Sequence, residues 1–133
     1  MAGYSATPQA RKLGLKSGQR FAAVAVPAGW DLDQPPHLDA AAEGAGSADV
    51  LLHFVRSAAE IPSAVESAAP RIFPAGALWV AWPRKAAGHV SDVTENAIRD
   101  VALARGLVDV KVAAIDEDWS GLKIVWRREL RKS

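Results

Sequence analysis

The sequence contains no cysteine among its 133 residues. This absence excludes disulfide bonds, thiolate zinc sites and thiol nucleophiles, and it fits a reducing compartment. The chain also has no apolar run near the roughly 20 residues that a membrane helix needs, and residues 1–17 lack the apolar segment of a signal peptide. We therefore expect a soluble cytoplasmic protein with no membrane partner.

Phosphate-binding glycine loops are also absent. The apolar segment 20–26 is followed by Pro27-Ala28-Gly29-Trp30, which has one glycine and no G-x-G motif. A dinucleotide or S-adenosylmethionine site needs a glycine-rich turn there, because the backbone must approach the ligand closely. No P-loop and no G-x-S-x-G nucleophile motif is present either. We expect no cofactor and no catalytic residue, with S-adenosylmethionine as the alternative.

Histidine and acidic residues give no metal-site pattern. His37, His53 and His89 are far apart, and none shares a metal-ligand spacing with another. His53 lies inside an apolar segment, which favours a hydrogen-bonded core histidine over a base or a ligand. The acidic run 116–118 is typical of a solvent-facing turn, with a divalent cation site as the less common explanation. We therefore predict no metal site.

The most informative segment that is present is the apolar run 77–82, which stops at Pro83 and is followed by Arg84 and Lys85. Such runs come from strands of a sheet that is covered on both faces. Trp79 and Trp82 are three residues apart, so they should point to opposite faces of this strand.

The remaining patterns predict one domain, 1–133, whose elements alternate between strand and helix. This order predicts a small three-layer α/β sandwich of Rossmann type, with a mostly parallel sheet and a C-terminal antiparallel hairpin. We expect Pro70 to end the regular part of the second helix and a bulge at Ser120-Gly121. The predicted helices are 9–13, 57–72 and 92 or 94–105, and the predicted strands are 20–26, 38–42, 49–55, 77–82, 107–115 and 122–126.

The loops after the parallel strands should meet at one edge of the sheet, where ligands bind in such folds. This edge would gather cations, a hydroxyl group at a helix N-terminus that could cradle an anion, an exposed histidine and two indole walls. The alternative is that the charges pair across the edge and keep it soluble, while the indoles serve packing. The expected ligand-binding residues are Trp30, Arg56, Ser57, Arg84, Lys85, His89 and Trp119.

The C-terminal segment 123–133 carries five basic residues and one acidic residue, Glu129. A basic tail attracts phosphate backbones, but nothing in this one can read bases. We therefore regard nucleic acid as an unlikely partner and expect an anionic small molecule or an acidic protein surface. The pattern leaves the oligomeric state open.

Two resemblances follow from these residues. The order of elements resembles the C-terminal half of class I methyltransferases, which implies S-adenosylmethionine as a cofactor. The second resemblance rests on the blocks 2–5 (AGYS), 12–16 (KLGLK), 76–85 (GALWVAWPRK), 106–111 (GLVDVK) and 119–123 (WSGLK). In this order they are similar to a family of small bacterial proteins designated domain of unknown function 3052, which implies one small domain and no particular activity.

These observations favour a non-catalytic binding or regulatory module with an anion or partner site at the carboxyl edge of the sheet. The alternative is a reduced methyltransferase-like enzyme that uses S-adenosylmethionine. A third hypothesis is weak nucleic-acid binding through the basic tail.

Overall fold

The computed structural model describes residues 9–32, 39–40 and 46–131. His37, the block 2–5 and the last two residues of the basic tail lie outside this part. The described strands are β1 (Arg20–Val24), β2 (Asp39–Ala40), β3 (Val50–Phe54), β4 (Ala77–Pro83), β5 (Leu107–Ala114) and β6 (Trp119–Trp126). The described helices are α1 (Gln9–Lys12), α2 (Ile61–Ile72) and α3 (Glu95–Ala104), with short 3₁₀ turns η1 (Ala58–Glu60), η2 (Lys85–Ala87) and η3 (Arg128–Leu130).

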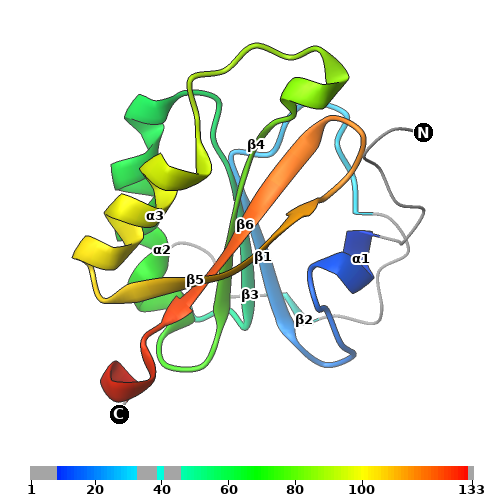
Figure 1. Cartoon of the computed structure of the whole chain (residues 1–133). Helices are drawn as coiled ribbons and strands as arrows, with labels where there is room; N and C mark the ends of the chain where they lie inside the picture. Colours follow the sequence, from blue (N-terminus) through cyan, green and yellow to red (C-terminus); the bar gives the residue numbers. More distant parts are fainter. Residues whose placement is uncertain (1–8, 33–38, 41–45, 132–133) are drawn as a thin grey trace.

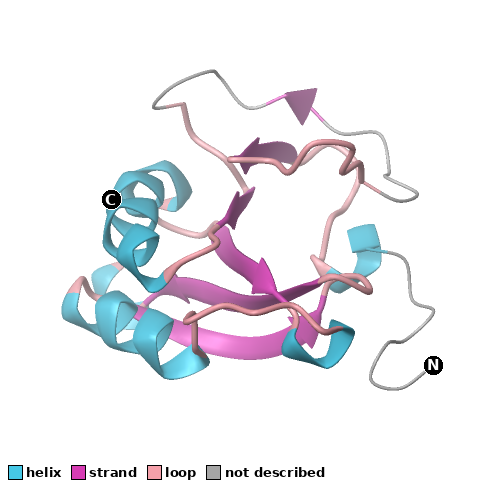
Figure 2. Ribbon diagram, turned by 90° about the horizontal axis from the view of Figure 1, so that it is seen from above, coloured by secondary structure: helices cyan, strands magenta, loops and turns pink. Residues whose placement is uncertain are grey.

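The six strands form one sheet in the order β2-β1-β3-β4-β6-β5. The strands β2, β1, β3 and β4 are parallel, whereas β6 runs antiparallel to both β4 and β5. Helices α2 and α3 cover one face, and α1 lies on the other (Figures 1 and 2). The predicted small Rossmann-like α/β fold, parallel at first and closed by an antiparallel hairpin, is confirmed.

The face under α2 and α3 is built from helices with an apolar stripe. In α2, Ile61, Val65 and Ile72 recur at helical spacing and are buried, and a proline fits the first turn. Helix α3 begins at the cap Thr94, whose hydroxyl oxygen accepts a hydrogen bond of 3.1 Å from the Ala97 backbone N–H. Both helices pack on one core with Leu78, Val80, Trp82, Leu122 and Ile124 of the sheet.

The opposite face is centred on Trp79, which is fully buried. Its indole N–H donates to the Leu13 carbonyl at 3.2 Å and so ties the segment after α1 to the middle of the sheet. Trp79 and Trp82 belong to different core clusters, which confirms that they point to opposite faces.

Two predicted boundaries along the first strand and the second helix are wrong. Strand β1 ends at Val24 and not at residue 26, because Ala25 adopts the left-handed conformation with φ 57° and turns the chain away. Helix α2 continues through Pro70 to Ile72. A proline this near the end of a helix removes only one backbone donor, so the last turn persists.

The hairpin also differs from the prediction. Strand β6 begins at Trp119, so Ser120 and Gly121 are regular strand residues paired with β4 and β5. The bulge lies in β5, between Asp109 and Lys111. In the predicted edge strand 38–42, residues 39 and 40 pair with β1, and the rest lies outside the described residues.

Candidate functional site

Arg84 leaves the end of β4 and fastens the turn between β5 and β6. Its guanidinium donates to the carbonyls of Glu117 at 2.9 Å and Asp116 at 3.4 Å, and its backbone N–H donates to the Asp118 carbonyl at 2.8 Å. The residue is only 7% exposed. The guanidinium therefore faces the carbonyl dipoles of the turn, and these hydrogen bonds hold the turn between β5 and β6 against the end of β4.

The carboxylate of Asp116 organises the same turn. One oxygen accepts the backbone N–H groups of Asp118 and Trp119 at 2.8 and 2.9 Å. The other accepts the Trp30 indole N–H at 2.9 Å and the Gln9 amide at 3.0 Å. Four donors thus meet at one carboxylate and join α1, the loop after β1 and the hairpin. Sequence reasoning predicted the turn but missed this role, because two of the donors are remote in the chain.

The two tryptophans predicted as ligand walls pack against Phe54, the last residue of β3. The centroids of the Trp30 and Trp119 rings lie 5.0 and 4.9 Å from the Phe54 centroid in edge-to-face geometry. Trp119 is 9% exposed, and Trp30 is half-buried. The trio closes the α1 face at the carboxyl edge of the sheet.

The donors at Ser57, which the sequence predicted to cradle an external anion, bind a carboxylate of the chain itself. The backbone N–H groups of Arg56 and Ser57 and the Ser57 hydroxyl donate to one oxygen of Glu60, at 3.2, 3.0 and 2.9 Å. The next backbone N–H, of Ala58, donates to Asp92 at 2.8 Å. The spacing S-x-x-E is a capping-box pattern, so the contact between Ser57 and Glu60 could have been predicted from the sequence. An external anion would have to displace this side chain.

The remaining predicted cations and the histidine contact different partners. The Arg56 guanidinium lies 5.8 Å from the Trp119 ring centroid. The His89 ring is exposed and its Nε2 lies 2.9 Å from an Asp118 carboxylate oxygen. Lys85 is exposed and begins η2. The structure therefore brings the predicted residues together in part, because Arg56 lies against Trp119 and the His89 backbone N–H donates to the Arg84 carbonyl at 3.3 Å.

His53 is half-buried in β3, as the sequence indicated. Its Nδ1 lies 3.1 Å from the Phe54 carbonyl. Burial lowers the pKa of this imidazole below its usual range, and the carbonyl and the charge of Glu60 oppose that shift less strongly.

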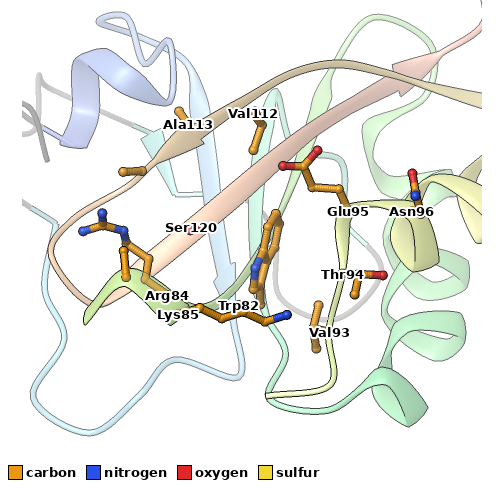
Figure 3. Close-up of a pocket in the computed structure, with 12 residues that line it drawn as sticks. Trp82, Arg84, Lys85, Val93, Thr94, Glu95, Asn96, Val112, Ala113 and Ser120 are labelled. Carbon is orange, nitrogen blue, oxygen red and sulfur yellow. The ribbon is translucent and has the colours of Figure 1, made fainter. Parts of the chain in front are cut away.

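A pocket of about 680 Å³ opens between the end of β4, the start of α3 and the hairpin (Figure 3). Of the predicted residues, it contains Arg84 and Lys85. Figure 3 shows the Lys85 ammonium pointing toward the segment before α3, whereas the Arg84 guanidinium points the other way. The lining residues that sequence reasoning missed are Trp82, Ala86, Val93, Thr94, Glu95, Asn96, Val112, Ala113, Ala114 and Ser120.

The polar groups of this pocket are unequally paired. Glu95 and the Asn96 side-chain carbonyl both contact Arg99, at 3.7 and 2.6 Å. This contact leaves the N–H groups of the Asn96 amide as donors. Within the described part of the chain, no carboxylate lies within ion-pair distance of Lys85. The pocket therefore offers an ammonium group, amide donors and the Glu95 carboxylate, which is paired with Arg99, beside an apolar wall.

Across residues 9–32, 39–40 and 46–131, no group of three or more histidine and acidic side chains could hold a metal ion. In the same ranges, no helix is both long enough and apolar enough to cross a bilayer.

Comparison with known proteins supports the fold. No protein-family model matches the chain, and no curated protein sequence matches it. The relation to domain of unknown function 3052 therefore stays a prediction.

Solved structures with a similar fold share little sequence with this chain. A provisionally assigned methyltransferase from Thermoplasma acidophilum is similar, with 8% identity and a TM-score of 0.53 over 86% of this chain and 70% of that one. A protein of the NADB-Rossmann superfamily from Streptococcus agalactiae has 11% identity and a TM-score of 0.53, over 94% and 70%. Magnesium protoporphyrin IX methyltransferase from Synechocystis PCC 6803 with bound SAH has 11% identity and a TM-score of 0.51, over 89% and 78%. At these identities the likeness shows a Rossmann-like fold.

Proposed function

We propose that the protein is a non-catalytic binding module that takes a small anionic molecule in the pocket between β4, α3 and the hairpin. The observation that carries this proposal is the pocket of about 680 Å³, whose rim holds an ammonium group that no carboxylate of the described residues pairs. Small-molecule sites are concave, within a range of roughly 300–1,000 Å³, and combine apolar walls with a few polar groups. We also propose a cytoplasmic location, which rests on the lack of cysteine.

The chemistry of the pocket indicates what the ligand carries. The Lys85 ammonium and the Asn96 amide N–H groups can both donate to a carboxylate or a phosphate group. Trp82 and Val112, which is 49% exposed, offer apolar surface to the rest of the molecule. Arg84 contributes as a positioning residue, because it fixes the hairpin turn. Arg56, Ser57, His89 and the two outer tryptophans are left out of this pocket.

A second candidate is a methyltransferase-like activity with S-adenosylmethionine. It is favoured by the likeness to the magnesium protoporphyrin IX methyltransferase whose structure holds SAH. The residues after β1 argue against it. The turn there has a single glycine, and the Trp30 ring lies against Phe54 while its N–H is bound to Asp116. These residues do not fit a turn whose backbone must approach a cofactor such as S-adenosylmethionine.

The test is a thermal-shift screen with carboxylates, amino acids, nucleotides and S-adenosylmethionine, followed by titration calorimetry. A ligand at a hundred times its Kd stabilises the protein by about 2.7 kcal/mol, which raises the melting temperature by several degrees. We expect Lys85→Gln with Asn96→Ala to abolish binding of the best anion. Arg127→Gln, in the exposed segment after β6, is the matched loss of charge and should leave binding unchanged.

Unchanged binding in the Lys85 and Asn96 double variant would show that the pocket is not the site. Binding of S-adenosylmethionine, but of no other anion in the screen, would replace the proposal by the second candidate.

A further inference from the structure

A like-charge pair lies in the middle of the hairpin. Lys111 of β5 and Lys123 of β6 are direct cross-strand partners. The neighbours of Lys123 along the strand, Leu122 and Ile124, belong to the core under α2 and α3, so Lys123 points to the α1 face. The Lys111 ammonium lies 5.9 Å from the ring centroid of Trp79, which belongs to that same face.

A third lysine comes from another element. Lys16 lies between α1 and β1 and directly follows Leu15, which is buried in the same core cluster as Trp79. Its positive charge acts on Lys123 together with that of Lys111. Burial is the largest cause of the lowered pKa of Lys123, and the charges of Lys111 and Lys16 follow. Three ammonium groups from three segments of the chain therefore share one area, which we call the lysine patch.

The described residues leave the lysine patch without a compensating acid. None of the three ammonium groups has a carboxylate within ion-pair distance there. Three acids of the hairpin are engaged elsewhere, since Asp109 lies 3.0 Å from Arg99 beneath α3, Asp116 accepts four donors and Asp118 lies 2.9 Å from His89. Like charges directly opposite each other in a sheet destabilise it. A bound anion would remove that cost.

We propose that Lys16, Lys111 and Lys123 form a second site, which binds a small molecule that carries clustered phosphate groups. Ammonium groups bind phosphate as point charges, and several of them around one area match several negative charges in a compact volume. Nucleic-acid strands usually need bases stacked on exposed aromatic rings. Trp79 beneath the patch is fully buried and offers none.

The lysine patch is independent of the pocket near α3. It lies on the opposite face of the sheet, and none of its three lysines lines that pocket. Each site can therefore be removed by substitution while the other is kept.

The probe for this site is inorganic triphosphate, titrated by calorimetry at low salt and at near-physiological salt. We expect triphosphate to bind more tightly than orthophosphate, and Lys111→Gln with Lys123→Gln to weaken it at least about tenfold. Arg127→Gln, after β6, removes the same charge elsewhere and should bind triphosphate like the unchanged protein. Circular dichroism checks that every variant is folded.

Three results would overturn the proposal. One is no binding of triphosphate at low salt, and another is equal affinity in the double variant. The third is binding of a single-stranded oligonucleotide through the same lysines without binding of triphosphate, which would assign the patch to nucleic acid.

Discussion

The two faces of the sheet are closed in different ways. On one face, the two amphipathic helices α2 and α3 bury a contiguous, mostly aliphatic core. On the other face, α1 has only four residues. Large aromatic rings and the Asp116 carboxylate, which accepts four hydrogen bonds, cover the sheet there instead. The difference shows that helical crossovers are one way to cover a sheet, and that fewer, larger and more polar contacts are another.

Because of this difference, single side chains contribute unequally to the stability of the two faces. The helical face spreads its stability over many small contacts. The α1 face concentrates it in single groups, above all Trp79 and Asp116. It also leaves part of the hairpin without a helix over it, and the lysine patch lies there.

Replacing Trp79 tests this concentration most directly. We expect Trp79→Ala to lower the free energy of unfolding by about 3–5 kcal/mol, because it removes the largest fully buried side chain and leaves a cavity. Trp79→Phe keeps most of the apolar area but leaves the Leu13 carbonyl without its donor, and should cost about 1 kcal/mol. Urea denaturation measures both. If Ile98→Ala in α3 costs more than Trp79→Ala, the proposed difference between the faces is wrong.

The second test removes the carboxylate that joins α1, the loop after β1 and the hairpin. We expect Asp116→Ala to cost about 2–3 kcal/mol, since it deprives the Trp30 indole and two backbone N–H groups of their acceptor. Asp116→Asn keeps the shape and one oxygen, and should cost less. Denaturation curves provide the measurement. Equal stability of Asp116→Ala and the unchanged protein would show that the polar closure is dispensable.

Mild acid should destabilise the protein through His53, which lies on the α2 and α3 side of β3. The pKa of His53 is lowered by burial, so just below pH 6.5 the unfolded state binds a proton that the folded state does not. The free energy of unfolding should therefore fall as pH decreases through this range, and level off below the folded-state pKa. His53→Gln should flatten this dependence when stability is measured from about pH 7.5 to about pH 5.5.

The carboxyl of Asp49 does not contribute to the pH dependence of stability in this range. Its pKa is lowered by hydrogen bonds from the Arg20 backbone and side chain, so it affects stability only at more acidic pH. An unchanged slope in His53→Gln would assign the acid sensitivity to other groups.

The smallest expected effect comes from the lysine patch. Lys111→Gln should raise the free energy of unfolding by a few tenths of a kcal/mol at low salt, because it removes a charge directly opposite Lys123. About 1 M NaCl screens exposed charges and should abolish the gain. A loss of stability at low salt would mean that the contact of Lys111 with the Trp79 ring outweighs the repulsion.

Much of the fold could be predicted from the sequence because its strands are apolar runs bounded by clear breaks. The run before Pro83 identified β4 and the opposite directions of Trp79 and Trp82. Predicted boundaries were wrong where a single backbone angle ended the element. At Ala25 the chain adopts a positive φ, which the preferences of alanine do not predict.

The candidate site was less predictable. Arg84 and Lys85 are adjacent in sequence and were predicted to act together, but one binds the hairpin turn and the other extends toward α3. Asp116 finds its donors in Gln9 and Trp30, and no local pattern specifies such distant contacts. The donors at Ser57, predicted to bind an external anion, bind Glu60, and the S-x-x-E spacing that indicates this contact was overlooked.

The bulge in β5 has a consequence for how this strand can change length. It lets Asp109 pair with Arg99 beneath α3 while Lys111, two positions later, lies over Trp79 on the other face. Removal of Val110 would restore regular alternation and keep both flanking segments on their present faces, whereas a deletion elsewhere in β5 would turn one segment inside out. The strand therefore has one position at which evolution can lose a residue at little cost.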